Sequence, residues 1–236
     1  RGPIRFTAVH SNIVFGIALD AARTKMATAS HDSRVRVWSL SDGKLLREFT
    51  DHRSAVRAVA FDDSGRQLAS ASTDGTVCVW DLRTGRRIHR FVAPQGPTAL
   101  AFRPGGTELY CVGVHELAAF DLGEPDRRVL RPHRSREQGN EFPYIYATRY
   151  SPGGRRILSG GWDGFVTITD VKSGTAIHRL AAGGRRVFDA AFLPGGKGIV
   201  ALSADNRALS GEGWIDIWDA EGTRVVRAHA PHHLYR

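Results

Sequence analysis

Apolar and polar residues alternate in short runs along the chain, and turn-forming residues separate the runs. Residues 55–61 alternate with a period of two, which indicates a half-buried strand, and the Asp-Asp-Ser-Gly stretch at 62–65 interrupts it. Residues 67–72, 76–80 and 87–91 form three further runs, of which 76–80 is β-branched and aromatic. Asp74-Gly75 between the second and third runs is a tight-hairpin signal. The segment therefore predicts four short antiparallel strands.

This four-strand pattern is repeated along the chain. Residues 26–38 and 68–80 match almost position for position, and both end on Trp. One residue near the end of each third run is followed by Asp or Ser. These marker residues are spaced by 42, 40, 49 and 49 residues: Trp38, Trp80, Phe120, Thr169 and Trp218. A period of about 40–45 residues that ends in Trp-Asp is typical of propeller blades. The markers predict five repeats, at approximately 10–49, 52–91, 92–131, 133–180 and 181–229.

On these residues the chain resembles the WD40-repeat family over essentially its whole length. The resemblance implies an all-β fold, a WD40 β-propeller of four-stranded antiparallel blades, as a single domain over residues 1–236. A seven-bladed ring needs about 290 residues, and residues 4–9 are patterned like the outer strand of a preceding or closing blade. We therefore expect a slice of a larger, about seven-bladed ring, with flanking domains in the same polypeptide. A five-bladed ring is the alternative.

The family implies a buried network of His, Ser or Thr, Asp and Trp in each complete repeat. An imidazole, a hydroxyl, a carboxylate and an indole N–H can satisfy one another, whereas each alone would cost about 1–3 kcal/mol when buried. Serine, histidine and aspartate also suggest catalysis, but these sets recur in each repeat and end on Trp, so we interpret them as structural. The matching residues are His10, Thr28, Asp32, Trp38, His52, Ser70, Asp74 and Trp80, with Ser159 and Asp163 in the fourth repeat.

The later repeats keep less of this network. The positions of the hydroxyl and the carboxylate can be counted back from the marker of each repeat. In the third repeat they hold Tyr110 and Val114, and in the fifth they hold Ala208 and Glu212. The fourth has Thr169 in place of Trp. We therefore expect polar contacts to specify the first two repeats most strongly, and apolar packing to hold the later ones.

Charge and motifs narrow the range of functions. The formal net charge of +9 is compatible with a nucleic-acid or acidic partner, but the arginines are scattered and no aromatic–basic RNA-binding motif occurs. Two cysteines make no disulfide framework, and no apolar run approaches the ~18 residues of a membrane span. His229, His232 and His233 lack Cys or carboxylate partners at ligand spacing. We expect no catalytic residue, metal, cofactor or membrane association, and a cytoplasmic location.

Partners of WD40 proteins usually bind the face that carries the starts of the first strands and the second-to-third-strand turns. The positions that match this face are Phe15, Arg57, Tyr146 and Phe188 on first strands and Trp162 in a turn. Aromatic residues and Arg are enriched at binding hot spots, and the turn around Trp162 predicts that its side chain points outward. The alternative is that Phe15 or Phe188 turns inward against a neighbouring blade.

These residues predict a non-catalytic protein–protein interaction scaffold, or a sensor or docking module, that binds other proteins or peptides. A nucleic-acid or chromatin-associated propeller that binds through its basic surface is the alternative.

Overall fold

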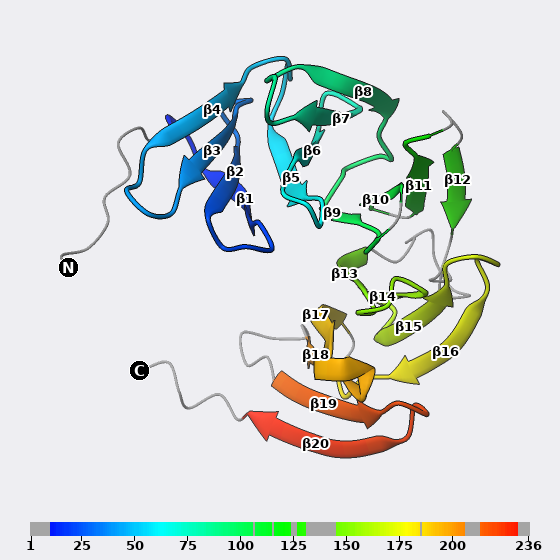
Figure 1. The fold of residues 1–236 in the computed structure, drawn as a ribbon. Helices are drawn as coiled ribbons and strands as arrows, with labels where there is room; N and C mark the ends of the chain where they lie inside the picture. Colours follow the sequence, from blue (N-terminus) through cyan, green and yellow to red (C-terminus); the bar gives the residue numbers. More distant parts are fainter. Residues whose placement is uncertain are drawn as a thin grey trace. The chain divides into compact units, whose positions relative to one another are not determined.

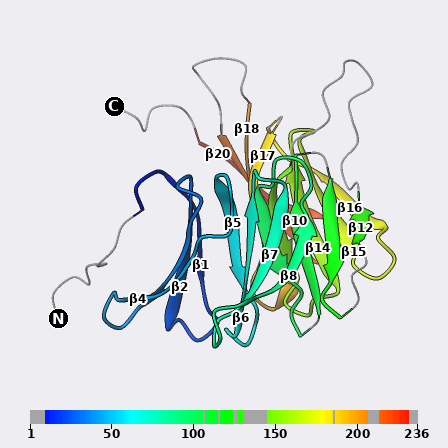
Figure 2. The ribbon, with the colours of Figure 1, turned by 90° about the horizontal axis from the view of Figure 1, so that it is seen from above.

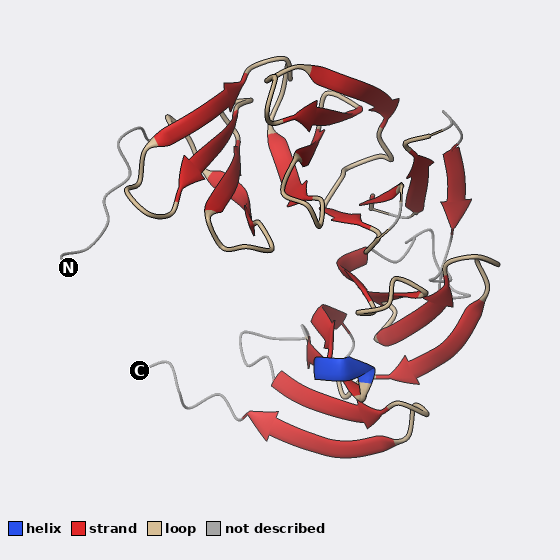
Figure 3. Ribbon diagram, viewed as in Figure 1, coloured by secondary structure: helices blue, strands red, loops and turns tan. Residues whose placement is uncertain are grey.

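The described part of the chain is built almost entirely from strands. The computed structural model describes residues 10–105, 107–114, 116–123, 127–130, 145–184, 186–205 and 213–230. Within these residues the secondary structure consists of strands β1 to β20 and one short 3₁₀ turn (Figures 1 and 3). None of these residues belongs to a helix long and apolar enough to cross a membrane.

The strands form five four-stranded antiparallel sheets, in which each strand pairs with its neighbour in sequence. In Figure 2 the strands of a sheet are seen running side by side. The first three sheets consist of β1 (Val14–Leu19), β2 (Lys25–Ser30), β3 (Val35–Ser39), β4 (Leu45–Phe49), β5 (Val56–Phe61), β6 (Gln67–Ser72), β7 (Thr76–Asp81), β8 (Arg87–Val92), β9 (Ala99–Phe102), β10 (Glu108–Val112), β11 (Leu117–Asp121) and β12 (Arg127–Leu130). The last two consist of β13 (Ile145–Tyr150), β14 (Arg156–Gly161), β15 (Phe165–Asp170), β16 (Ala176–Ala181), β17 (Arg186–Phe192), the turn η1 (Pro194–Gly196), β18 (Gly198–Ala204), β19 (Gly213–Asp219) and β20 (Arg224–Ala230).

The chain divides into two compact units. The first comprises Arg1–Gly113 and Ala118–Arg128, and the second comprises Val114–Leu117 and Val129–Arg236. The sheets β1–β4 and β5–β8 belong to the first unit, and β13–β16 and β17–β20 belong to the second. The all-β fold of four-stranded antiparallel sheets is confirmed, whereas the number of blades in a complete ring and the single domain over 1–236 stay predictions.

The acidic residue at the end of a third strand closes the turn to the fourth strand. Asp81 Oδ1 accepts the backbone N–H of Thr84 at 2.6 Å, and Asp170 Oδ1 accepts that of Ser173 at 2.7 Å. The glycine that follows Thr84, Gly85, has a φ of 73°, a region that glycine enters without a steric penalty. Aspartate and glycine recur at these positions because together they make the turn.

Large side chains on outer strands pack against the third strand of the next sheet. Phe49 of β4 stacks on Trp80 of β7 with ring centroids 4.4 Å apart, and Phe91 of β8 stacks on Phe120 of β11 at 4.7 Å. In the second unit Leu180 of β16 lies in one buried cluster with Trp218 of β19. The third-strand markers of the sequence therefore anchor the contact between successive sheets within each unit.

Strand pairing corrects two assignments made from spacing. Ser70 lies opposite Val59 on β5, and Cys111 lies opposite Leu100 on β9 in the same way. Cys111, rather than Tyr110, thus occupies the hydroxyl position of the third sheet, nine residues before its marker instead of the ten seen in the first two sheets.

The fifth sheet shows a larger displacement. Ala201 lies opposite Ala190 and Asp216, as Ser70 lies opposite Val59 and Cys78. Ala201 precedes the marker Trp218 by 17 residues, because the connection between β18 and β19 is longer than in the first two sheets. Ala208 and Glu212 lie outside the described residues.

The stack of Phe49 on Trp80 provides a test of the packing between sheets. Phe49→Ala removes a buried ring and leaves a cavity, so we expect a loss of about 3–5 kcal/mol in the free energy of unfolding. Leu46→Ala, at an exposed position of the same strand, should change it by less than about 1 kcal/mol. Urea unfolding followed by circular dichroism measures both, and equal losses would contradict the assignment.

Candidate functional site

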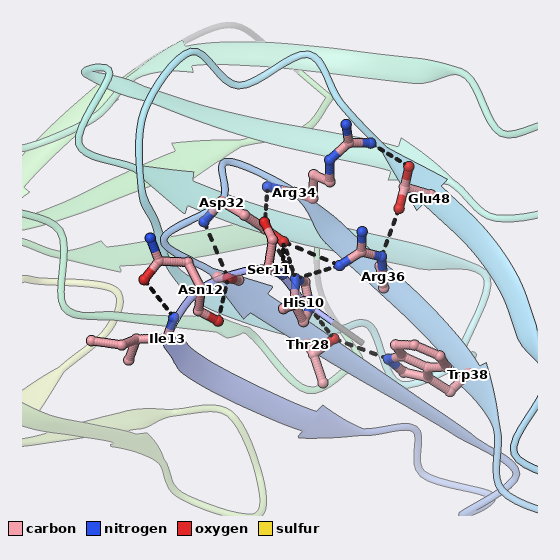
Figure 4. Close-up of polar contacts among 11 residues, drawn as sticks. His10, Ser11, Asn12, Ile13, Thr28, Asp32, Arg34, Arg36, Trp38 and Glu48 are labelled. Carbon is pink, nitrogen blue, oxygen red and sulfur yellow. Dashed lines mark hydrogen bonds and ion pairs between the residues drawn. The ribbon is translucent and has the colours of Figure 1, made fainter. Parts of the chain in front are cut away.

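In the first sheet a hydrogen-bonded chain joins a third-strand indole to a turn carboxylate (Figure 4). Trp38 Nε1 donates to Thr28 Oγ1 at 3.0 Å, and that oxygen lies 2.7 Å from His10 Nε2. His10 Nδ1 lies 2.9 Å from Asp32 Oδ2. Since the indole can only donate, the Thr28 proton is free to go to Nε2, and the His10 Nδ1–H then points at the carboxylate.

The second sheet repeats this chain with serine in place of threonine. Trp80 Nε1 donates to Ser70 Oγ at 2.9 Å, Ser70 Oγ lies 2.8 Å from His52 Nε2, and His52 Nδ1 lies 3.0 Å from Asp74 Oδ2. The structure therefore brings together all eight residues that the sequence assigned to the first two networks. Each hydroxyl is held between the indole and the imidazole.

The carboxylates of both networks carry many hydrogen bonds. Burial alone would raise the pKa of Asp74, but hydrogen bonds from the Thr76 hydroxyl, the Arg53 N–H and His52 outweigh it and lower the pKa to about 2. Asp32 behaves in the same way, because hydrogen bonds from His10 and two backbone N–H groups outweigh burial and lower its pKa to about 2. Burial lowers the pKa of His52, which favours the neutral imidazole.

The first network extends further because of one substitution on the third strand. Arg36 stands where the second sheet has Cys78. Its guanidinium donates to Asp32 Oδ2 at 3.2 Å and to Glu48 Oε2 at 2.6 Å, so the network reaches the outer strand β4 (Figure 4). Burial raises the pKa of Cys78, which therefore stays a neutral thiol.

In the fourth sheet an arginine pairs with the turn carboxylate. Asp163 Oδ2 accepts from Arg179 at 3.1 Å, and Asp163 Oδ1 accepts the backbone N–H of Phe165 at 3.1 Å. Arg179 also lies over the Phe165 ring, at 3.6 Å. Ser159 Oγ donates to the carbonyl oxygen of Thr167 at 3.5 Å.

The fifth sheet contains a buried carboxylate that the sequence analysis missed. The Asp216 side chain is fully buried and accepts from Arg227 Nε at 2.7 Å and from the backbone N–H of Gly183 at 2.6 Å. It also forms an ion pair with Arg224 at 3.4 Å. The signal was an acidic residue in the middle of the apolar Trp-Ile-Asp-Ile-Trp run. Polar contacts therefore also hold the fifth sheet, which we had expected to depend mainly on apolar packing.

Four of the five residues predicted for the partner face occupy one structural position. The pairing of first and second strands is interrupted after Val14, Val56, Ile145 and Val187. A β-bulge adds an unpaired residue and redirects its side chain, and bulges are frequent next to functional sites. The bulge residues are Phe15, Arg57, Tyr146 and Phe188.

In the first unit the bulge residues form a group that we call the first aromatic cluster: Phe15, His31 and Arg57. The Arg57 guanidinium carbon lies 4.2 Å from the centre of the Phe15 ring, and the His31 ring lies 5.9 Å from it. Phe15 is 37 % exposed, so the inward orientation considered for it is wrong.

In the second unit the second aromatic cluster contains Tyr146, Trp162, Arg186 and Phe188. Tyr146 lies 5.9 Å from both Trp162 and Phe188, and its ring is nearly parallel to that of Phe188, at 26°. The Arg186 guanidinium lies 3.6 Å over the Trp162 ring. Phe188 is 47 % exposed and does not turn inward. Trp162 is only half exposed, because Tyr146 and Arg186 cover it, and so it does not project freely as predicted.

Arg186 and His31 belong to these clusters but were not among the five residues predicted for the partner face. His31 directly precedes the turn residue Asp32, and Arg186 lies two residues before Phe188 on the same strand. Among the described residues, no group of three or more His, Cys, Asp or Glu side chains could hold a metal ion. The expected absence of metal and cofactor stays a prediction for the whole chain.

Comparison with known families adds direct evidence on the repeats. The family model for the WD domain, G-beta repeat (WD40) matches residues 2–39, 43–81 and 131–170. The chain belongs to the WD40-repeat family. Comparison with curated proteins finds no match.

The three WD40 matches agree with the geometry of the blades. They end at Ser39, Asp81 and Asp170, the residues that follow the third-strand markers. The third match covers the fourth blade although Thr169 replaces Trp there. WD40 repeats generally mediate protein–protein interactions as non-catalytic scaffolds, which is as far as the family alone carries the function.

The low pKa of His52 predicts acid sensitivity. An unfolded histidine titrates near 6.5, so below that pH the unfolded chain binds a proton that the folded His52 resists. Stability is therefore complete above about pH 6.5 and falls as the pH decreases towards the folded pKa. The lowered pKa of Asp74 adds a second loss, as the pH falls from about 4 through 2.

The His52 contribution can be isolated with one variant. His52→Gln removes the titrating group, so its free energy of unfolding should vary less than that of the wild type between about pH 7 and 4.5. His31→Gln, at an exposed histidine, should follow the wild type. Urea unfolding across this pH range measures the difference, and parallel curves for His52→Gln and the wild type would refute the account.

Proposed function

We propose that this chain is a non-catalytic interaction module that binds other proteins or peptides through the two aromatic clusters, one in each unit. The observation that carries the proposal is the shared bulge position, which presents an aromatic or guanidinium side chain in four blades. Aromatic and guanidinium side chains are the types enriched at binding hot spots, and the bulge places one of them at the same backbone position in each of these blades.

The exposed rings support binding rather than packing. Phe15 and Phe188 leave much of their apolar surface in water. Covering a Phe side chain fully contributes about 1.5–3 kcal/mol, so a partner that covers these rings gains free energy that the isolated chain does not use. Rigid aromatic side chains also lose little conformational entropy on binding, which is why they dominate hot spots.

The network geometry supports the non-catalytic part of the proposal. Each imidazole that faces a hydroxyl, His10 or His52, also faces a carboxylate, and the same hydroxyl accepts from a Trp indole. These residues sit within the sheets, and the Thr28 and Ser70 side chains are buried. A nucleophile needs an oxygen that a substrate can reach, which neither of these buried hydroxyls offers.

Nucleic-acid binding is favoured less than protein binding. The observation that supports nucleic-acid binding is the net charge of +9. Several arginines form ion pairs with carboxylates of the chain, as in Arg87–Asp51 at 2.6 Å and Arg103–Glu108 at 2.8 Å. Their charge is therefore already neutralised within the protein. We propose a cytoplasmic location with the interaction role, because Cys78 and Cys111 are both free thiols.

Selection of displayed peptides tests the proposed face. Peptides from a random phage library are selected on the wild-type chain, and their affinities are measured for a Phe15→Ser, Phe188→Ser double variant. Loss of both exposed rings should weaken binding at least about tenfold, as expected for hot-spot residues, and should shift Tm by only a few degrees.

A control variant separates the face from apolar exposure in general. Leu46→Ser, Ile177→Ser changes equally exposed aliphatic residues on outer strands and should bind the peptides like the wild type. Peptides that lose affinity for this control but not for the double Phe variant would refute the proposed face.

A further inference from the structure

The second aromatic cluster contains a guanidinium that stacks without an ionic partner. Arg186 is the first residue of β17, and its guanidinium carbon lies 3.6 Å from the centre of the Trp162 ring. Among the described residues, no carboxylate lies within ion-pair distance of this guanidinium and no side chain or carbonyl accepts a hydrogen bond from it. The stacked cation thus has its donors available.

Four other arginines of the same unit use their donors within the chain. Arg179 also stacks on a ring but donates to Asp163, and Arg149 pairs with Asp189 at 3.5 Å. Arg224 and Arg227 share Asp216. Arg155 and Arg156 are exposed and form no described ion pair, but no ring lies against them. Arg186 therefore combines a fixed orientation with an unused charge.

We propose that Arg186 is a preorganised receptor for an oxyanion, the carboxylate or phosphate of a side chain in a bound peptide. This rests on the peptide-binding role proposed above and names the chemistry that the second aromatic cluster selects. A guanidinium that lies flat on a ring keeps its N–H donors in its own plane, directed away from the ring edge. That fork matches two oxygens of a carboxylate or phosphate, and the stacking contact holds it in place before the ligand arrives.

The surroundings of Arg186 suit an anionic ligand. Two nearby acidic residues of the unit, Asp163 and Asp189, are neutralised by Arg179 and Arg149. Phe188, two residues further along β17, is exposed and stacks on Tyr146. An oxyanion on Arg186 and an aromatic or aliphatic side chain on Phe188 can therefore come from neighbouring residues of one peptide.

The first unit also contains an arginine stacked on an aromatic ring. Arg57 lies 4.2 Å over the Phe15 ring, and its guanidinium likewise has no ion pair with any described carboxylate. The first two blades thus repeat, with different residues, the combination of an exposed ring and an unpaired stacked arginine. Because a stacked arginine without an ion pair occurs in both units, we interpret it as a functional feature rather than a chance contact.

Four short peptides test the inference. We choose N-acetylated, C-amidated Gly-X-Phe-Gly, in which X is Glu, Gln, phosphoserine or Lys, and titrate each into the full chain. The NMR signals of the Trp162 indole N–H and the Arg186 side-chain N–H report binding at the cluster. The Glu or the phosphoserine peptide should bind at least about tenfold more tightly than the Gln peptide, and the Lys peptide should bind more weakly than both. The ratio of the Glu and phosphoserine affinities distinguishes a carboxylate from a phosphate receptor.

Variants assign the preference to Arg186. Arg186→Gln should bind the Glu and Gln peptides equally, and Arg186→Lys, which keeps the charge without the planar fork, should retain only a small part of the preference. Arg155→Gln, a matched loss of an exposed arginine, should keep the wild-type preference.

The outcomes separate this inference from the proposed function. If all four peptides bind equally and perturb the Trp162 signal, the peptide-binding face stands and the oxyanion receptor is refuted. If no peptide perturbs the cluster, or if the preference survives in Arg186→Gln, the oxyanion receptor is also refuted. Failure of the phage-selected peptides to depend on Phe15 and Phe188 would refute the face itself.

Discussion

A buried carboxylate that accepts backbone N–H groups is the interaction on which the proposed binding face depends. Asp74 accepts the N–H of Arg53, which precedes the first strand of its blade, at 2.9 Å, and the N–H of Thr76, which follows the turn, at 2.9 Å. Asp32 accepts the N–H groups of Ser11 and Arg34 in the same way. One carboxylate thereby joins the segment that leads into a first strand to the start of the third strand, and a carboxylate without such donors would be costly to bury.

The remaining network residues keep that carboxylate in position. Trp80 holds the Ser70 hydroxyl, Ser70 holds the His52 imidazole, and His52 faces Asp74, so a third strand in the core is linked to a turn at the surface. In the fifth blade Asp216 comes from the third strand, yet it accepts the N–H of Gly183 ahead of β17 at 2.6 Å. Asp74 and Asp216 thus have the same structural role although they come from different elements. Each anchors the segment that leads into a first strand, next to the bulge that carries the proposed contact residue.

Local patterns in the sequence predicted most of the fold, because each strand and turn depends on residues that are adjacent in the chain. All five third-strand markers lie within third strands of the structure, and the networks of the first two blades bring together the expected residues. Spacing failed where a connection changes length, as it did for Tyr110 in the third repeat and Ala208 in the fifth.

The candidate face was less accessible to sequence analysis. Its residues could be named from the repeat register, but the bulges are visible only in the strand pairing. The cover of Arg186 over Trp162 and the partners of Asp216 join residues of different strands, which spacing does not encode. The first contact depends on the packing of one blade against the next, and the pairing of Asp216 with Arg227 depends on the register of β19 and β20.

Amide hydrogen exchange in the wild type and in Asp74→Ala tests most directly whether the carboxylate anchors the face. The account predicts that the Arg53 and Thr76 amides, which donate to Asp74, exchange roughly ten to a hundred times faster in the variant, from a loss of about 1–3 kcal/mol. The Ala69 amide on the central strand β6 should change much less. Equal acceleration at Ala69, Arg53 and Thr76 would contradict the account, because Asp74 would then contribute only to global stability.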